Sequence, residues 1–354
     1  MKLFKRIVLT GVALALGGVA SAQADTLTIG LSAEPTSMDP HFHRFAPNNS
    51  LVSHFFESLL SQDKDQRLLP GLAEWVQPID DTTWRIELRK GVEFSDGTPF
   101  TAKDVVYSLC RLPNVPNSPS SFAEFQSGIT EVEVVDDHTL IIKTAHALPL
   151  LPASLSAFGI ISAAASGQTS DITYKPNECD GIDGFPATEA FNSGAVAIGT
   201  GPYKLVSFVS GDRIVLQANE NYWGGAPEWS EVVFRPITSS GPRVAAILAG
   251  DVDVIENPPV QDIPRLEADP NVDVFSGLSN RVIYISPDHA RDDTPGVSGT
   301  NGVNPFKDVR VRQAVSMAID RGAIAARIMG GQAVPAAELL PPGMFGANFD
   351  FEPT

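Results

Sequence analysis

Apolar and polar residues alternate along several short stretches of the chain, which is the pattern of half-buried β-strands. The clearest stretch covers residues 82–89, where Trp84, Ile86 and Leu88 fall on one face. The same pattern predicts further strands. They lie at residues 27–31, 131–135, 139–143, 204–209, 213–217, 231–237 and 252–256.

Helical spacing of apolar residues appears in other parts of the chain. It predicts helices at residues 49–60, from Thr101 onward, at 243–249 and at 305–320. Asp104 stands three residues after Thr101 and predicts a capping box at that helix start. The helix at 305–320 is expected to bury one apolar face. Its members are Val311, Ala314, Val315, Ala318 and Ile319.

The amino terminus has the pattern of a secretory signal peptide. Lys2, Lys5 and Arg6 precede an uncharged apolar run over residues 7–20, which small residues follow. Cleavage after Ala22 or Ala24 fits these small residues, and we expect it after Ala24. The run is too short to span a membrane comfortably, so the mature protein is expected to be exported and not inserted in the bilayer.

Length and charge narrow the possible functions. The 354 residues suffice for more than one domain, and the net charge is −17. Loss of residues 1–24 removes three basic residues and no acidic one, which makes the net charge −20. Such a surface repels polyanions, so unselective binding to nucleic acid or to anionic lipid is disfavoured.

The chain has two cysteines, Cys110 and Cys179. In an oxidising compartment they can form a disulfide, which would tie the helix that begins at Thr101 to an irregular stretch. That stretch, residues 167–197, is rich in Gly, Pro, Asn and Asp and has little periodicity. Sequence separation alone does not show whether the two Cα atoms come close enough, so two free thiols remain the alternative.

Three motifs occur in a recognisable order. The first is residues 71–97, with a strand followed by the Asp96-Gly97 turn; the second is Gly199-Thr-Gly-Pro-Tyr203; the third is the helix at 305–320. Pro202 removes an amide donor from the second motif, which favours a structural turn over a phosphate loop. Together the motifs resemble the bacterial extracellular solute-binding proteins of family 5, the peptide- and nickel-binding subunits of ABC importers.

This resemblance implies a mixed α/β (α+β) fold, namely a two-lobed periplasmic binding protein of type II, cluster C-like. Residues 25–48 and 199–279 would form the main sheet of lobe I, and 49–198 an extra small α+β subdomain of that lobe. Residues 280–354 would form the crossover, with a strand at 280–285, and part of lobe II. Family members generally run further, so the chain is expected to be C-terminally truncated with an incomplete second lobe.

The resemblance also suggests ligand-binding residues. The loop with His43, Arg44, Phe45 and Ala46 matches the part of lobe I that faces peptide ligands. Phe122 stands where an aromatic residue covers the ligand, and the crossover beside the cleft carries three further candidates, which are Asn280, Arg281 and Tyr284.

Each of these candidates has a structural alternative. Arg44 and Arg281 could hold a carboxylate with two hydrogen bonds, yet most arginines are solvated or form weak surface pairs. Phe122 and Phe125 could stack over a ligand, yet aromatic residues at this spacing more often belong to a core.

Metal binding is a further possibility near the first strand. His41 and His43 alternate with Phe42, so both imidazoles could face one metal ion or chelate. Two histidines do not complete a coordination sphere, and neighbouring Asp39 precedes a proline, as turn residues do. Asn48 and Asn49 are expected to cap the following helix.

These observations favour a periplasmic solute receptor for a small peptide or a peptide-like, carboxylate-bearing solute. Its expected partner is the membrane permease of an ABC importer; we expect a monomer, no cofactor and no nucleic acid. Binding of an opine or of a nickel-type metal chelate is the alternative within this class. A secreted hydrolase is the alternative outside it, although the chain has no Gly-x-Ser-x-Gly, His-Glu-x-x-His or phosphate-loop motif.

Overall fold

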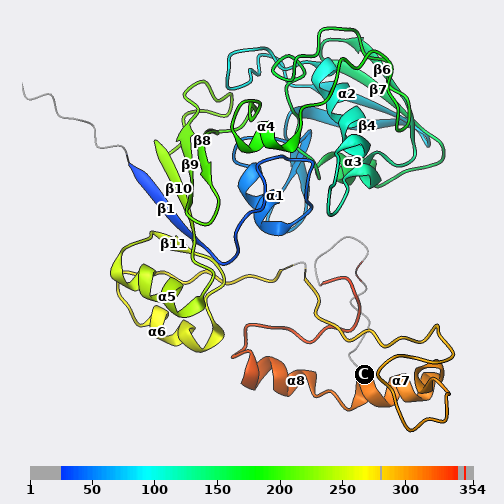
Figure 1. Ribbon diagram of the computed structural model, residues 1–354, viewed down its shortest axis with the longest axis vertical. Helices are drawn as coiled ribbons and strands as arrows, with labels where there is room; N and C mark the ends of the chain where they lie inside the picture. Colours follow the sequence, from blue (N-terminus) through cyan, green and yellow to red (C-terminus); the bar gives the residue numbers. More distant parts are fainter. Residues whose placement is uncertain (1–24, 280, 342–346, 348–354) are drawn as a thin grey trace, which may run out of the picture.

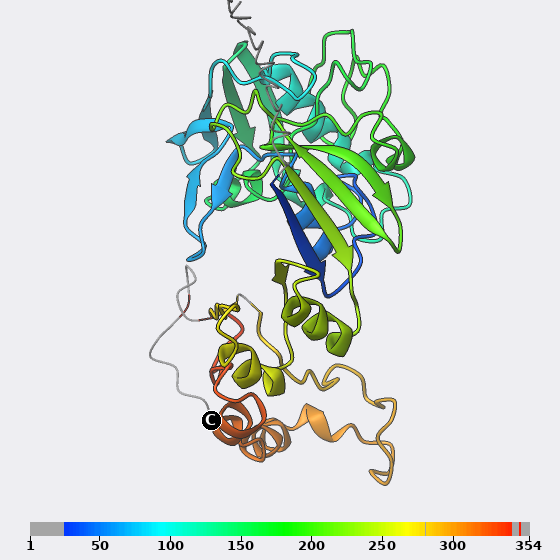
Figure 2. The same cartoon turned by 90° about the vertical axis from the view of Figure 1, so that its left-hand side faces the viewer.

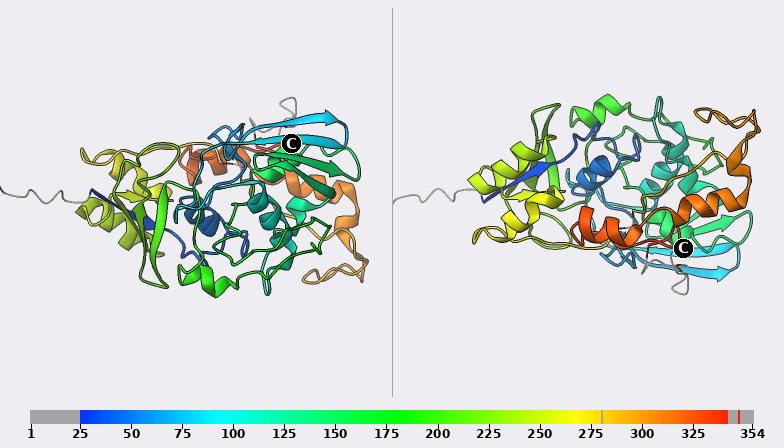
Figure 3. Two further views of the ribbon diagram at one scale, coloured as in Figure 1. Left: turned by 90° about the horizontal axis from the view of Figure 1, so that it is seen from above. Right: turned by 90° about the horizontal axis from the view of Figure 1, so that it is seen from below.

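Two β-sheets with surrounding helices form most of the structure, a computed structural model that describes residues 25–279, 281–341 and 347 (Figure 1). The expected signal peptide lies outside these residues. Seen from above and below, the two sheets lie on either side of helix α1 (Ala46–Val52) (Figure 3). In the described part of the chain, no helix has the length and apolarity needed to cross a bilayer.

The larger sheet has five strands in the order β11-β1-β10-β9-β8. Strand β1 pairs in parallel with both of its neighbours, β10 and β11. Ile29 lies opposite Phe234 on one side and Val254 on the other. The other pairs are antiparallel. The strands are β1 (Thr26–Leu31), β8 (Tyr203–Val209), β9 (Arg213–Ala218), β10 (Glu231–Pro236) and β11 (Val254–Ile255).

The second sheet has four antiparallel strands in the order β4-β5-β7-β6. Trp84, Ile86 and Leu88 of β5 are buried, as their alternation predicted. The strands are β4 (Ala73–Asp80), β5 (Thr83–Leu88), β6 (Ile129–Asp136) and β7 (Thr139–Thr144). A separate hairpin joins β2 (Leu60–Gln62) to β3 (Leu68–Pro70).

Helix α2 (Ala102–Arg111) links the cores of the two sheets. Its Val105, Val106 and Leu109 pack in the core of the four-stranded sheet, whereas Tyr107 packs in the core of the five-stranded sheet. The predicted capping box is present, and the Thr101 N–H donates to Asp104 Oδ2 over 2.9 Å. Because α2 is buried on both sides, it fixes the two sheets relative to each other.

The Gly199-Thr-Gly-Pro-Tyr203 motif packs directly against the backbone that follows α1. A Cβ on Gly199 would lie 1.7 Å from the Phe55 carbonyl oxygen, and one on Gly201 would lie 2.7 Å from that of His54. The Gly201 and Tyr203 amides donate to the same two carbonyls. These glycines are therefore required by close backbone approach, as expected of a structural turn.

The irregular stretch at residues 167–197 contains one short helix, α4 (Thr188–Asn192). A disulfide joins Cys110, near the end of α2, to Cys179 in this stretch, with their Cα atoms 5.9 Å apart. The remaining short helices of the first 270 residues are α3 (Leu151–Leu155), α5 (Ser240–Ala249), α6 (Ile263–Glu267), η1 (Leu112–Asn114), η2 (Ala123–Gln126) and η3 (Val260–Asp262).

The helix expected at 49–60 is shorter and starts earlier. It is α1, which ends at Val52, and Leu60 already belongs to β2. Phe55, Phe56 and Leu59 after it are buried at the helical spacing that suggested the longer helix. The backbone there pairs with other segments instead, since the His54 and Phe55 carbonyls accept the Tyr203 and Gly201 amides. The expected cap was also wrong: Asn48 lies inside α1, where its Oδ1 accepts the Thr36 N–H over 2.8 Å.

The last described part of the chain lies at the opposite end of the molecule from the four-stranded sheet (Figures 1 and 2). It contains η4 (Pro305–Lys307), α7 (Val309–Met317), α8 (Arg321–Ala323) and η5 (Ile324–Ile328). The helix expected at 305–320 therefore begins later, because Asp308 caps α7 by accepting the Arg310 N–H. Its apolar face is not buried, since no residue of α7 is buried.

The strand expected at 280–285 is absent from the described residues 281–285. Ile283, Tyr284 and Ile285 are all largely exposed. Alternating residues form a strand only where a neighbouring strand pairs with them, and the described segment has none.

Candidate functional site

The loop between β1 and α1 is fixed by a buried ion pair. Asp39 accepts two hydrogen bonds from Arg111 of α2, over 2.8 and 2.6 Å, and a third from Thr188 Oγ1 over 2.8 Å. The side chains of the pair are at most 1% exposed. Burial alone would raise the pKa of Asp39, but the Arg111 hydrogen bonds and charge lower this pKa below its ordinary value.

His41 belongs to the interior and not to a metal site. Its Nε2 lies 2.7 Å from the Gly159 carbonyl oxygen, to which the ring N–H donates. Burial lowers the pKa of His41 to about 4, and the Arg111 charge acts in the same direction, so the imidazole is neutral near pH 7.

His43 has different surroundings from His41. Its Nδ1 lies 2.9 Å from Thr36 Oγ1, and its ring stacks on Phe45 with centroids 5.2 Å apart. Among the described residues no group of three or more His, Cys, Asp or Glu side chains could hold a metal ion. The two imidazoles thus have different partners, and no third ligating side chain in the described part of the chain joins them.

The same loop lies against residues 118–126. His43 and Ser120 form a parallel β-bridge, and the Arg44 N–H donates to Ser120 Oγ over 2.8 Å. Ser118 Oγ donates to the Phe42 carbonyl over 2.5 Å. The structure thus brings together two of the segments that the sequence singled out for ligand contact.

Arg44 is the charged group where the His43–Ala46 loop meets residues 118–126, a contact that we call the Arg44 junction. Its guanidinium lies over the Phe125 ring, 5.0 Å from the centroid, and Nη1 lies 2.5 Å from Glu124 Oε1. The Arg44 side chain is 35% exposed and that of Glu124 is 59% exposed. A partly exposed guanidinium held over an aromatic ring is suited to binding a carboxylate.

The other expected site residues take different places. Phe122 is only 1% exposed and contacts the rings of His41 and Phe125, so it has the core role that the sequence left as its alternative. Ala46 is exposed as the first residue of α1. Asn280 lies outside the described residues.

Arg281 and Tyr284 are exposed on the segment that leads to α7. The Arg281 N–H donates to Ser279 Oγ. No hydrogen bond, ion pair or ring contact recorded for residues 281–285 joins them to the His43–Ala46 loop. That Arg281 and Tyr284 lie beside the same ligand cleft as the His43–Ala46 loop stays a prediction.

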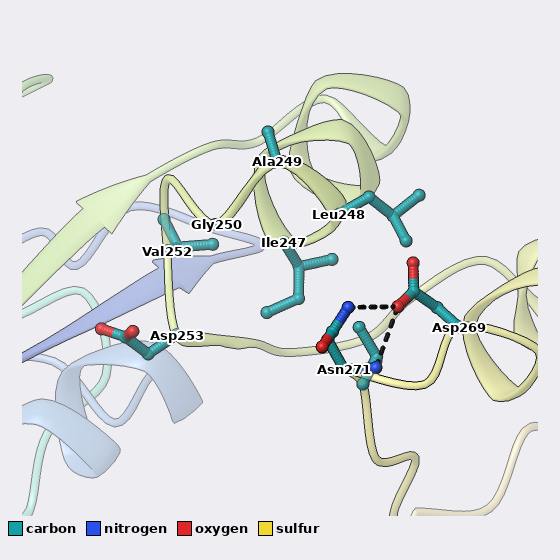
Figure 4. Close-up of a pocket in the computed structure, with 9 residues that line it drawn as sticks. Ile247, Leu248, Ala249, Gly250, Val252, Asp253, Asp269 and Asn271 are labelled. Carbon is teal, nitrogen blue, oxygen red and sulfur yellow. Dashed lines mark hydrogen bonds between the residues drawn. The ribbon is translucent and has the colours of Figure 1, made fainter.

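A pocket of about 380 Å³ lies elsewhere, between the end of α5 and residues 269–272 (Figure 4). None of the expected site residues lines it. The carboxylates in its wall bind the chain itself: Asp269 accepts from the backbone and side chain of Asn271, and Asp253 accepts the Thr28 N–H. This pocket is therefore distinct from the Arg44 junction.

Sequence reasoning missed two parts of this junction. Glu124 stands next to Phe125 and has the charge opposite to Arg44, which was the only available signal for their pairing. The Asp39–Arg111 pair joins residues 72 positions apart, and no local pattern connects them.

The fold agrees with comparisons to known proteins. Residues 67–354 match the family model described as "Bacterial extracellular solute-binding proteins, family 5 Middle". The chain belongs to this family, and its mixed α/β fold matches solved periplasmic binding proteins.

Particular relatives are peptide-binding proteins by name. The periplasmic oligopeptide-binding protein OppA of Escherichia coli K12 is 29% identical over 353 residues, which cover 94% of this chain and 59% of OppA. The glutathione-binding protein GsiB of the same organism is 26% identical, with 96% and 60% covered. The chain thus spans about 60% of the length of these relatives.

Solved structures show the same partial coverage. The murein tripeptide-binding protein MppA of Escherichia coli superimposes with a TM-score of 0.71 at 27% identity, over 91% of this chain and 61% of MppA. The oligopeptide-binding protein AppA of Bacillus subtilis, in complex with a nonapeptide, gives a TM-score of 0.74 at 22% identity, over 92% and 60%. The second likeness concerns the fold alone.

Proposed function

We propose that this protein is a periplasmic receptor that binds a small peptide or a peptide-like, carboxylate-bearing solute and delivers it unchanged to the permease of an ABC importer. The observation that carries the proposal is the Arg44 guanidinium, which is partly exposed on a loop that Asp39 and Arg111 fix from inside. Its Cζ lies over the Phe125 ring and the side chain is 35% exposed, which suits it to binding a carboxylate.

The names of the relatives support the ligand class. Oligopeptides, dipeptides, glutathione and a murein tripeptide are the ligands named for them, and all carry a carboxylate. The signal-peptide pattern and the strongly negative net charge suit an exported protein that works in solution.

The proposal includes a mechanism of two lobes. Residues 25–279 would form lobe I, with residues 49–198 as its extra subdomain, and residues 280–354 would start the crossover and lobe II. A solute held between the lobes makes all of its contacts only in the closed form, so it shifts the population toward that form, which a permease can recognise. Binding then requires no covalent step and no oligomer.

Ligand binding to the product of the complete gene tests the proposal. A thermal-shift screen would compare di- and tripeptides, glutathione, opines and metal chelates, followed by calorimetry of any compound that stabilises the protein. We expect stabilisation by peptide-like acids and a weaker effect of their C-terminal amides. Absence of stabilisation by every class, together with turnover of any compound, would reject the receptor in favour of a hydrolase.

A further inference from the structure

Arg44 and Glu124 are mounted on fixed backbone although their side chains are exposed. The Arg44 backbone is held by Ser120 Oγ. Glu124 lies on η2, which is anchored on one side by buried Phe122 and on the other by Gln126, whose Oε1 accepts the Tyr174 hydroxyl over 2.6 Å. The two charged groups therefore meet because their backbones place them together, and only the side chains need to move to separate them.

The Glu124 carboxylate in the Arg44–Glu124 ion pair can readily be replaced by another carboxylate. Exposed ion pairs contribute little to stability, since water and salt compete with both partners. The contact joins Nη1 of Arg44 to Oε1 of Glu124, and a guanidinium can offer an incoming carboxylate two parallel N–H donors. Arg44 Cζ lies over the Phe125 ring, so this cation–π contact does not use the carboxylate and can persist when one carboxylate replaces another.

We propose that Glu124 is an internal competitor for the ligand carboxylate at Arg44, and that it determines how tightly an acidic ligand is held. This inference rests on the proposed function. A ligand carboxylate must displace Glu124 to reach the guanidinium, so its affinity is reduced by the strength of the internal pair. A ligand without a carboxylate leaves the pair intact and is unaffected. For a receptor that must release its solute, returning Glu124 assists dissociation.

Affinities of an acid and its matched amide test this role. Trialanine, trialanine amide and glutathione would be titrated into the wild-type protein and the Glu124→Gln, Arg44→Met and double variants. Glu131→Gln is the control, because Glu131 also forms an exposed ion pair, with Lys143, and loses the same charge. Stopped-flow measurement of dissociation completes the set.

We expect Glu124→Gln to bind trialanine about two- to five-fold more tightly through slower dissociation, the gain that loss of an exposed pair allows. Its affinity for trialanine amide should stay unchanged, as should both affinities of Glu131→Gln. In the Arg44→Met background the effect of Glu124→Gln on trialanine should disappear, because the two carboxylates then have no guanidinium to compete for.

Three results would overturn the inference. They are an unchanged or weaker trialanine affinity of Glu124→Gln, an equal gain for acid and amide, and a gain that persists in the Arg44→Met background. A gain that persists in the Arg44→Met background would show that Glu124 repels the ligand carboxylate but does not compete with it for Arg44. If no acid of the thermal-shift screen, trialanine and glutathione included, binds the wild-type protein, the inference falls together with the proposed function; if an acid binds and Glu124→Gln has no selective effect, only the inference falls.

Discussion

Asp39 and Arg111 face each other in the interior, where Nη1 and Nη2 donate to Oδ1 and Oδ2 over 2.8 and 2.6 Å. Arg111 also lies over the Phe191 ring and donates to the Pro186 carbonyl. The pair therefore connects three segments: the loop before α1, the end of α2 and the stretch that contains α4. The loop that carries His43 and Arg44 owes its position to this connection.

Replacement of Arg111 by Met should destabilise the protein strongly. It leaves the Asp39 carboxylate buried without its cation, which is expected to lower the free energy of unfolding by about 3 to 5 kcal/mol. Urea unfolding at pH 7 measures the loss. The control is Arg213→Met, since Arg213 and Asp212 are both more than half exposed and their pair should contribute about 1 kcal/mol or less. Similar losses in the two variants would contradict the structural role of the buried pair.

His41 should make the protein less stable as the pH falls from 6.5 to 4. Burial, assisted by the Arg111 charge, lowers its pKa to about 4 in the folded protein, whereas the unfolded chain has the ordinary value near 6.5. The unfolded state therefore binds more protons in this window, and the stability that neutral His41 provides above pH 6.5 is lost toward pH 4.

Urea unfolding of wild type and His41→Gln across this range isolates the effect. Gln keeps an N–H donor for the Gly159 carbonyl but does not titrate. Relative to the variant, the wild type should lose on the order of 3 kcal/mol between pH 6.5 and 4. A difference that stays constant with pH would show that His41 does not titrate in this way.

Asp104 should have the opposite pH dependence. Burial raises the pKa of this helix-capping carboxyl to about 6, although the Ala163 and Thr101 amides donate to it. The folded state then binds more protons than the unfolded state between about pH 4 and 6, so the contribution of Asp104 to stability falls as the pH rises through this range.

The matched variant is Asp104→Asn, which keeps an acceptor and removes the titration. We expect the difference in unfolding free energy, wild type minus variant, to decrease by on the order of 3 kcal/mol from pH 4 to pH 6.5. An increase over this range would mean that the amide donors outweigh burial and hold the pKa down.

The positions of most strands could be predicted from local patterns, because alternation reports which face of a strand is buried. Trp84, Ile86 and Leu88 are an example, and the capping box of Thr101 and Asp104 is another. Both depend on residues a few positions apart. The pairing of Cys110 with Cys179 could also be anticipated, since the chain has no other cysteine.

Other features depend on tertiary contacts that no local pattern contains. The family resemblance implied a strand at residues 280–285, but the described residues there have no strand beside them and stay exposed. Phe122 matched a ligand-contacting position, yet it lies in the core because η2 turns it toward His41. The partner of Arg44 is likewise defined by the meeting of two loops, so the sequence could indicate the cation but not Glu124.

Loss of the disulfide should destabilise the protein through the unfolded chain. Cys110 and Cys179 are 69 positions apart, and a crosslink over a loop of this length is expected to contribute about 4 kcal/mol in the chain-entropy treatment. The Cys110→Ser/Cys179→Ser double variant tests this by urea unfolding without reductant. Wild-type protein unfolded in dithiothreitol should approach the variant, and a loss below about 1 kcal/mol would show that the crosslink adds little.

Helix α7 should be less protected from hydrogen exchange than helix α5, although the two have nearly the same length. In α5, Arg243 and Val244 are buried, and Arg243 donates to four backbone carbonyls. No residue of α7 is buried, and its Val309 and Met317 are more than half exposed.

Amides of a helix without packed contacts open in local fluctuations, whereas those of a packed helix require larger openings. Mass-spectrometric exchange on this chain should therefore show α7 labelled at least about ten-fold faster than α5. Equal protection of the two helices would mean that α7 is packed against a surface in solution, in conflict with its exposure in the structure.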